Sequence, residues 1–336
     1  PTAPFNRPPH NQGYYMTAFT RLWHRAPLWR TALITAGVCG TLSILFPAPW
    51  LSARLPGYGA LSSKVRHMLP SAMGGTEASD ALHPDEDQRT VSIPPMDAQF
   101  EGSVAFAGRQ LPLPAGKWHP IVNFQDDVAH GEVLTTLYVR SAQGIVTGLI
   151  IAQATTQSLP VAAVRMIQDE CHSSFNFMNE AAPQDGNRNE CWMTTPIRVV
   201  NNLFLTSNEA LQALLSDQMY IPPAVQRLTM MGFDLPPILV DAGWNLVEKS
   251  KSGAGVDFMS VHMLLSPAEA GGRRVPGSPE NWSRAGMADS GAVTDFVQRT
   301  NSWLRGWVPT LEHGFDSKLT PNTAPPAEAM DPAFHG

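Results

Sequence analysis

Four residues of this sequence are of types that could carry out acid–base chemistry, and they fall in one short stretch. They are His119, Asp126, Asp127 and His130. A carboxylate can orient an imidazole ring, and a ring held in this way can serve as a general base in hydrolysis. The same residue types are also common in solvated loops between strands. Catalysis by this set therefore remains a hypothesis at the level of sequence.

Two cysteines, Cys171 and Cys191, enclose a polar segment rich in turn-forming residues. A disulfide would stabilise such a loop by about 3 kcal/mol. Metal binding is the alternative, because Asp169, Glu170 and His172 flank the first cysteine, and free thiols are a third possibility. Zinc sites usually have paired ligands at both ends of the motif, and here only one end is rich in ligands. We therefore expect a disulfide and no metal site.

Common catalytic and cofactor-binding motifs are missing from the sequence. It contains no G-x-S-x-G, H-E-x-x-H, phosphate-binding G-x-x-x-x-G-K-[ST] or dinucleotide-binding G-x-G-x-x-G pattern, and no C-x-x-C-H haem motif. We expect no cofactor. A hydrolase remains possible, because catalytic triads are defined by geometry rather than by local sequence.

Charge is distributed unevenly along the chain. Residues 1–76 contain seven Lys/Arg and no acidic residue, leaving 16 of the 23 basic residues for the remainder, against all 29 acidic ones. A basic segment favours the anionic surface of a lipid bilayer. An acidic body does not favour nucleic acid, which binds to clustered basic side chains.

Residues 31–51 are uncharged and predominantly apolar, with Trp29, Arg30 and Trp50 at their borders. About 20 apolar residues in a helix span the ~30 Å hydrocarbon core of a membrane. A cleaved signal peptide or a buried core helix are the alternatives, but the segment lacks a small-x-small cleavage site. We expect a single transmembrane helix over residues 26–51, following a disordered basic segment at 1–25.

The count of basic residues does not determine the orientation in the membrane, because three of them lie near the span on each side. The arginines that precede it lie closer, and a cysteine pair in the large domain suits an oxidising compartment. These two points favour a cytoplasmic N-terminus and a large domain on the extracytoplasmic, periplasmic side. Cys39 lies within the span, where it cannot reach the other two cysteines.

The remaining chain indicates a flexible linker at 52–95, one domain at 96–315 and a disordered tail at 316–336. Apolar and β-branched residues predict strands within 100–107 and 118–124, and hairpins formed by 132–140 with 145–153 and by 238–250 with 256–265. A Thr206-x-x-Glu209 capping box predicts a helix at 207–219, and a second short helix is expected at 224–231. Runs of strands without regular βαβ alternation predict an α+β fold with a largely antiparallel sheet.

Residues 290–311 form the longest amphipathic pattern, with an apolar stripe that includes Phe296, Trp303 and Trp307. Such stripes are usually buried in a core, so we expect this helix to pack on the sheet. His262 falls in the middle of a predicted strand, where a hydrogen-bonded structural role is expected.

Taken together, these features favour a membrane-anchored envelope protein that acts by binding, as an accessory or assembly component of a membrane complex. Its expected partners are the lipid bilayer and a membrane or envelope protein. The alternative is an exported, membrane-tethered hydrolase that uses His119, Asp126, Asp127 and His130.

Overall fold

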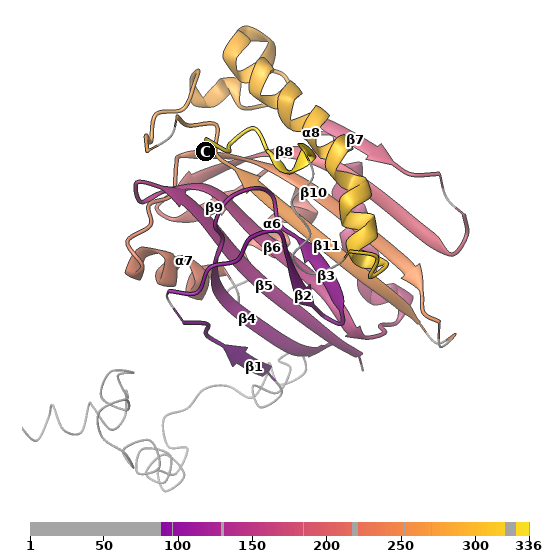
Figure 1. Ribbon diagram of the computed structural model, residues 1–336. Helices are drawn as coiled ribbons and strands as arrows, with labels where there is room; N and C mark the ends of the chain where they lie inside the picture. Colours follow the sequence, from indigo (N-terminus) through magenta and orange to yellow (C-terminus); the bar gives the residue numbers. More distant parts are fainter. Residues whose placement is uncertain are drawn as a thin grey trace, which may run out of the picture. The chain divides into compact units, whose positions relative to one another are not determined.

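A computed structural model describes residues 89–95, 97–128, 131–183, 185–216, 221–251, 253, 255–269, 271–319 and 327–335. These residues form an α+β fold with a largely antiparallel sheet (Figure 1). The expected transmembrane helix at 26–51 lies outside them. Within the ranges given above, no helix is both long enough and apolar enough to cross a membrane.

One large antiparallel sheet organises the domain. Its order is β1-β4-β5-β6-β11-β10-β8-β7, and the short strand β9 also pairs with β8. The strands, in sheet order, are β1 (Arg89–Ser92), β4 (His119–Val128), β5 (Gly131–Ala142), β6 (Ile145–Gln157), β11 (Val256–Leu265), β10 (Ile238–Lys249), β8 (Arg188–Val200), β7 (Met178–Ala181) and β9 (Leu203–Leu205).

Both hairpins that the sequence predicts are present. β5 pairs with β6 and β10 pairs with β11, each along nearly its whole length. The β5–β6 turn places Gln143 and Gly144 at φ 51° and 81°. Two successive residues with positive φ are typical of the type I′ turn, whose twist matches that of the strands that it joins.

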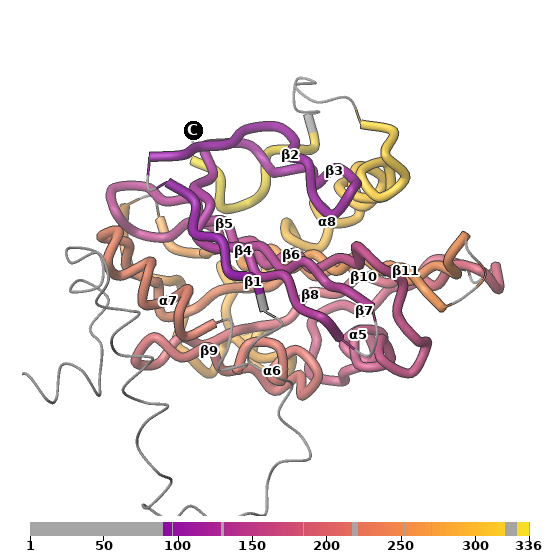
Figure 2. Tube along the Cα trace, turned by 90° about the horizontal axis from the view of Figure 1, so that it is seen from below, coloured from indigo at the N-terminus to yellow at the C-terminus, as the bar shows by residue number. Residues whose placement is uncertain are grey.

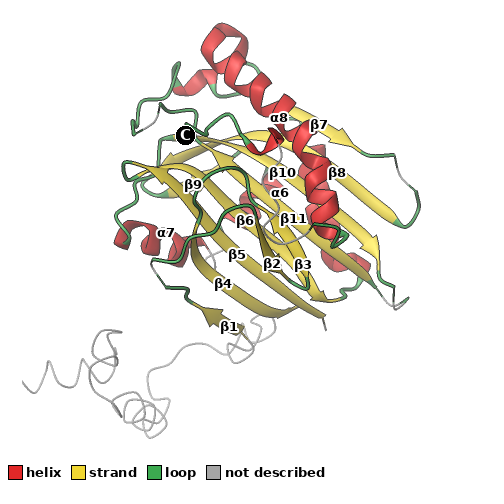
Figure 3. Ribbon diagram, in the orientation of Figure 1, coloured by secondary structure: helices red, strands yellow, loops and turns green. Residues whose placement is uncertain are grey.

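Helices and a small hairpin cover the sheet on both faces (Figures 2 and 3). One face, here called the α8 face, carries α8 (Gly291–Phe315) and the hairpin of β2 (Ser103–Phe106) and β3 (Arg109–Pro112). The other, the α6 face, carries α5 (Arg165–Asp169), α6 (Glu209–Leu215) and α7 (Ile221–Met230). Short 3₁₀ helices complete the domain: η2 (Val161–Val164), η3 (Glu170–His172), η4 (Pro279–Asn281), η5 (Met287–Asp289) and η6 (Ala327–Ala329).

Helix α8 buries the apolar stripe that the sequence predicts. Phe296, Trp303 and Trp307 are all buried against the sheet, and Trp307 is only 1% exposed. Near its end the helix passes very close to β3, because a Cβ atom on Gly314 would lie 2.4 Å from the backbone oxygen of Gln110. Glycine is therefore required at this contact, since any side chain would push the helix away from the hairpin.

Three segments differ from the expectations. The predicted linker at 52–95 contains strand β1, which pairs with β4. Helix α6 is capped by Asn208, whose side chain accepts a hydrogen bond from the Leu211 amide, rather than by Thr206. The strand β8 was not expected at all.

The expectation of a disordered tail is also wrong for residues 327–335. Asp331 forms a bidentate ion pair with Arg140 of β5, with N–O distances of 2.6 and 2.9 Å. The Asp331 side chain has no exposed surface. The Ala115 amide donates a hydrogen bond to the Ala329 carbonyl 2.8 Å away. A single charged pair and its neighbours therefore hold this segment on the sheet.

Candidate functional site

Of the four residues proposed for acid–base chemistry, the structure describes three, and these three do not form one site. His119 begins β4, whereas Asp126 and Asp127 lie near its other end. At ~3.3 Å per residue, seven residues of strand separate His119 from Asp126 by about 23 Å. Asp126 is buried and Asp127 is exposed, so their side chains point to opposite faces. His130 lies outside the described residues.

His119 instead lines a surface cavity of about 450 Å³ together with Lys117, Arg140 and His335. The ring of His119 lies 5.7 Å from that of Phe233. Arg140 is fully engaged here, because its guanidinium also donates to the Ala115 carbonyl and the Thr147 hydroxyl. Glu101 also lines this cavity, but the His119 Nδ1 atom has no hydrogen-bond partner in the part of the chain that is described.

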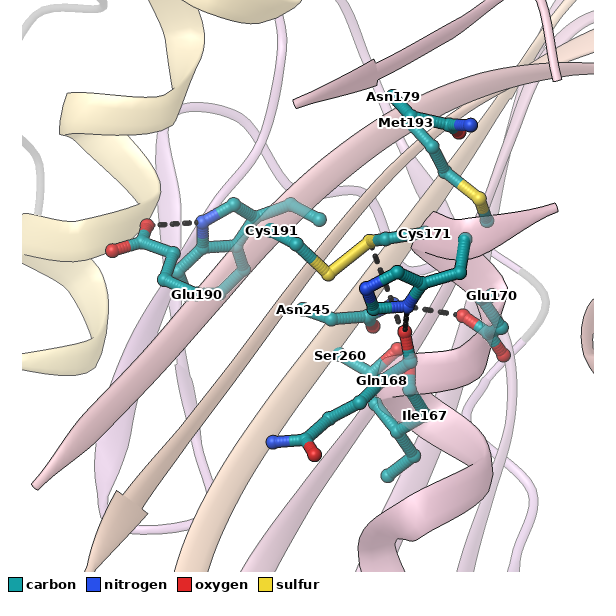
Figure 4. The surroundings of a disulfide bond; sticks show 12 residues. Ile167, Gln168, Glu170, Cys171, Asn179, Glu190, Cys191, Met193, Asn245 and Ser260 are labelled. Atoms are coloured by element: carbon teal, nitrogen blue, oxygen red, sulfur yellow. Dashed lines mark hydrogen bonds between the residues drawn. A yellow bond between two sulfur atoms is a disulfide. The ribbon is translucent and has the colours of Figure 1, made fainter. Parts of the chain in front are cut away.

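Cys171 and Cys191 are joined by a disulfide, as expected, with their Cα atoms 6.2 Å apart (Figure 4). Cys171 lies in η3 and Cys191 in β8, so the bond fastens the 3₁₀ helix to the α6 face of the sheet. Both cysteines are buried, at 5% and 6% exposure. A disulfide of this kind is consistent with an exported protein.

Glu170, next to Cys171, is held by three asparagines from separate segments. Asn176 and Asn208 each donate to its backbone carbonyl at 2.9 Å, and Asn245 of β10 donates to its carboxylate at 2.8 Å (Figure 4). The second proton of the Asn245 amide goes to the Ile167 carbonyl, 2.9 Å away. The disulfide and these hydrogen bonds hold the Glu170 side chain against the α6 face of the sheet.

A buried cluster of charged side chains follows from that placement. His262 of β11 contacts Asp241 of β10 through Nδ1 at 2.9 Å, and through Nε2 it contacts Glu170 at 3.3 Å and the Ser260 hydroxyl at 3.1 Å. His262 and Asp241 have no exposed surface, and Glu170 is 4% exposed. The structural role expected for His262 is confirmed in its hydrogen bonding, and the ring cannot be reached by a substrate.

Electrostatics keep this histidine charged at neutral pH. Burial alone lowers the pKa of His262, but the charges of Asp241 and Glu170 and their hydrogen bonds outweigh burial and raise it to about 10. Burial raises the pKa of the Asp241 carboxyl, and the nearby His262 opposes this. The cluster is a buried network of charged side chains between the disulfide and the sheet, rather than a catalytic centre open to solvent.

The sequence held a usable signal for this cluster. Asp241 and Asn245 are four residues apart, and Ser260 and His262 are two apart, in the largely apolar central parts of two strands that the sequence predicts to form a hairpin. Even spacing in a strand places side chains on one face. The missing information was the register of the two strands and that Glu170 would complete the group from η3.

A different part of the α6 face is open and apolar. A groove of about 560 Å³ runs between α7 and the β8–β9 turn, and none of its lining residues is charged. Leu203 and Met230 stand in its wall with 57% and 67% exposure, and Val200 is also about half exposed beside it. Asn201 and Asn202, at φ 50° and 62°, form the tight turn that holds this edge in place.

Comparison with known proteins identifies no relative: no family model, no curated protein and no solved structure matches this chain.

Proposed function

We propose that this chain is a single-pass, membrane-anchored envelope protein whose large periplasmic domain acts by binding, as an accessory or assembly component of a membrane complex. The groove between α7 and the β8–β9 turn supports this proposal. Exposed, contiguous apolar surface of this size is a common feature of sites at which other proteins bind. The disulfide supports residence in an oxidising compartment.

The groove fits the apolar side of an amphipathic helix from a membrane-protein partner. Its lining combines Leu203, Val225 and Met230 with the uncharged amides of Asn201 and Gln226. An uncharged apolar centre with a polar rim is the usual composition of a protein interface. The ten residues of α7 extend for about 15 Å, which matches two to three turns of a docked helix.

One wall of the groove is fixed to the segment that follows β1. The Arg227 guanidinium of α7 donates a hydrogen bond to the Pro94 carbonyl, 2.7 Å away, and Pro94 lies two residues after the end of β1. This bond helps to hold α7, and with it the groove, in place.

Co-purification in mild detergent tests the proposal. Met230→Glu places a carboxylate in the groove, where burial by a partner would be costly, so recovery of the partner should fall at least about tenfold. Met330→Glu is the matched control, because Met330 is 65% exposed against 67% for Met230 and lies next to η6 on the α8 face. This control should keep the partner.

Photo-crosslinking identifies the occupant directly. With p-benzoylphenylalanine in place of Met230, the expected product is a crosslink to an amphipathic segment of a membrane protein. Three outcomes would contradict the proposal. The protein could be recovered alone, the recovery of the partner could be unaffected by Met230→Glu, or the crosslink could join Met230 to residues 1–88 of the same chain.

A further inference from the structure

The outer edge of β8 is interrupted by a gap between two short strands. β7 pairs with β8 as far as Thr194, and β9 begins its pairing at Arg198. Thr195, Pro196 and Ile197 lie between these two pairings. Neither β7 nor β9 covers them, so the edge of the sheet is open at this point.

Pro196 explains why the edge is open here. The Phe177 amide donates to the Thr194 carbonyl on the outer side, whereas the Val199 amide donates to the Pro237 carbonyl on the β10 side. Successive residues of a strand direct their backbone groups to alternate sides, so Pro196 faces outward with Thr194 and Arg198. Proline has no N–H to offer to an outer partner, and it is tolerated in a sheet where no such partner exists.

A cavity of about 410 Å³ occupies this gap, and two cationic side chains line it. Arg198 comes from β8, and Arg284 comes from the loop that follows η4. Arg284 donates one long hydrogen bond, 3.3 Å, to the Ser174 carbonyl. The Arg198 side chain forms no hydrogen bond or ion pair with the described residues. Most of the donors of both guanidinium groups are therefore unused.

Neutral polar residues and two aromatic residues complete the cavity. Thr206, Ser207 and Ser283 line it, together with the buried Trp282 and with Phe175, which is 55% exposed. Thr195 also contributes to the wall; it is fully buried, and its hydroxyl oxygen has no partner in the described structure. Buried hydroxyls are normally hydrogen-bonded, so this one lacks an acceptor or donor that a ligand could supply.

The local charge is opposite to that of the domain as a whole. Two arginines and one acidic residue, Glu280, line the cavity, whereas the chain carries a formal net charge of −6. A hydrogen bond from Ser278 is the main cause of the lowered pKa of Glu280, with a smaller contribution from the charge of Arg198. Glu280 is thus near enough to Arg198 to compete with an incoming anion.

We propose that this cavity binds a small organic anion whose phosphate or carboxylate group is held by Arg198 and Arg284 and whose apolar part lies against Phe175. Guanidinium groups form strong, charge-assisted hydrogen bonds with both oxyanions. The hydroxyls of Thr206 and Ser207 supply further donors to the same oxygen atoms, whereas the Ser283 hydroxyl already donates to the Glu280 carbonyl. This site adjoins the apolar groove, because Leu205 lines both, but it does not depend on the function proposed for that groove.

Calorimetric titration of the full chain in detergent, with phenyl phosphate as the probe, tests the proposal. Arg198→Gln and Arg284→Gln should each weaken binding about tenfold, because each removes a charged hydrogen-bond donor. Glu280→Gln should strengthen binding about two- to threefold, because it removes a like charge from the cavity. Benzoate in place of phenyl phosphate distinguishes a preference for carboxylate from one for phosphate.

Arg299→Gln is the control, because Arg299 is an exposed arginine on α8 that pairs with Asp295 and does not line the cavity. It should bind phenyl phosphate like the unmodified chain. The proposal is overturned if neither probe binds, if both cavity arginine variants retain full affinity, or if Arg299→Gln weakens binding as much as they do. Weaker binding to Glu280→Gln would also contradict it. Unchanged thermal melting of each variant shows that the fold is intact.

Discussion

The two faces of the same pair of strands, β10 and β11, are stabilised in different ways. Toward α8 the central parts of these strands present apolar side chains: Val240, Ala242, Trp244, Leu246, Met259, Val261, Met263 and Leu265. Toward α6 they present Asp241, Asn245, Ser260 and His262, all of which are buried. These side chains are thus buried on both faces. On the α8 face they are apolar, whereas on the α6 face they are polar or charged and depend on hydrogen bonds and ion pairs.

On the α8 face, stability depends on volume and shape. Apolar side chains can be exchanged for others of similar size at a modest cost, usually below about 1.5 kcal/mol. On the α6 face, stability depends on each charged group keeping its partners, because an unpaired buried charge is very costly. Adjacent residues of one strand should therefore respond very differently to substitution.

His262 and Met263 are neighbours in β11 with no exposed surface, and they provide the strongest test of this difference. His262→Leu leaves the carboxyl groups of Asp241 and Glu170 buried without their shared cation, so the free energy of unfolding should fall by about 3–5 kcal/mol. Met263→Leu, on the opposite face, should cost less than about 1.5 kcal/mol. Urea denaturation of both variants measures the two values.

A combined variant sharpens the result. Replacing Glu170, Asp241 and His262 together by Leu, Val and Leu removes all three buried charges at once. Complete replacement of a buried ion cluster by apolar residues is often neutral or stabilising. The combined variant should therefore be more stable than His262→Leu alone; if it is less stable, the cost at His262 comes from lost packing rather than from unpaired charge.

The disulfide should have the next largest effect. Cys191→Ser removes the bond that fastens η3 to β8, and the free energy of unfolding should fall by about 3 kcal/mol through the freedom gained by the unfolded loop. Denaturation of the unmodified chain with and without a reducing agent gives an independent value. If reduction leaves the midpoint unchanged, the asparagine contacts to Glu170 are sufficient to hold η3.

The smallest predicted effect lies at Glu190, a buried carboxyl group of β8 that contacts Trp244. Glu190 accepts a hydrogen bond from the Trp244 indole at 2.6 Å, and burial, with Glu312 nearby, raises its pKa to about 7. The folded state therefore holds a proton that the unfolded state releases near pH 4.5, so stability should decrease as the pH rises from about 4.5 to 7.

Glu190→Gln should remove this pH dependence. Between about pH 4.5 and 7, the free energy of unfolding of this variant should fall by about 1–2 kcal/mol less than that of the unmodified chain, after allowance for partial screening by solvent. Thermal melting in buffers from pH 4.5 to 7.5 measures the slope. Glu248→Gln, at the exposed end of β10, is the control and should leave the slope unchanged.

Local patterns predicted the regular parts of this fold. The two hairpins and α8 depend on residues close together in the sequence, so alternation and helical spacing were sufficient to find them. β8 was missed because Trp192, Thr194 and Pro196 interrupt a simple pattern, and because its long neighbour in the sheet, β10, is supplied by a distant segment. The N-cap of α6 is Asn208 rather than the predicted Thr206, because the Asn208 side chain is also held in place by its hydrogen bond to the Glu170 carbonyl.

The candidate sites were less accessible to sequence reasoning. The disulfide could be predicted, because compartment and loop composition constrain a cysteine pair. The clustering of Asp241, His262 and Glu170 depends on strand register and on the place where η3 docks, neither of which a single sequence determines. The cavity near Arg198 and Arg284 joins residues from β8 and the η4 loop, so proximity in the sequence gave no indication of it.

The ion pair between Arg140 and Asp331 has a consequence for the synthesis of the domain. The two residues are 191 positions apart, so the carboxylate that neutralises this buried guanidinium is made after every strand of the sheet. β6 likewise pairs with β11, which is synthesised much later. Contacts so distant in sequence form slowly, and an unpaired strand edge favours aggregation in the meantime. The newly made chain therefore passes through a period in which the β5–β6 hairpin has one edge exposed, until β11 pairs with β6. Arg140 gains its carboxylate partner only later, when Asp331 docks.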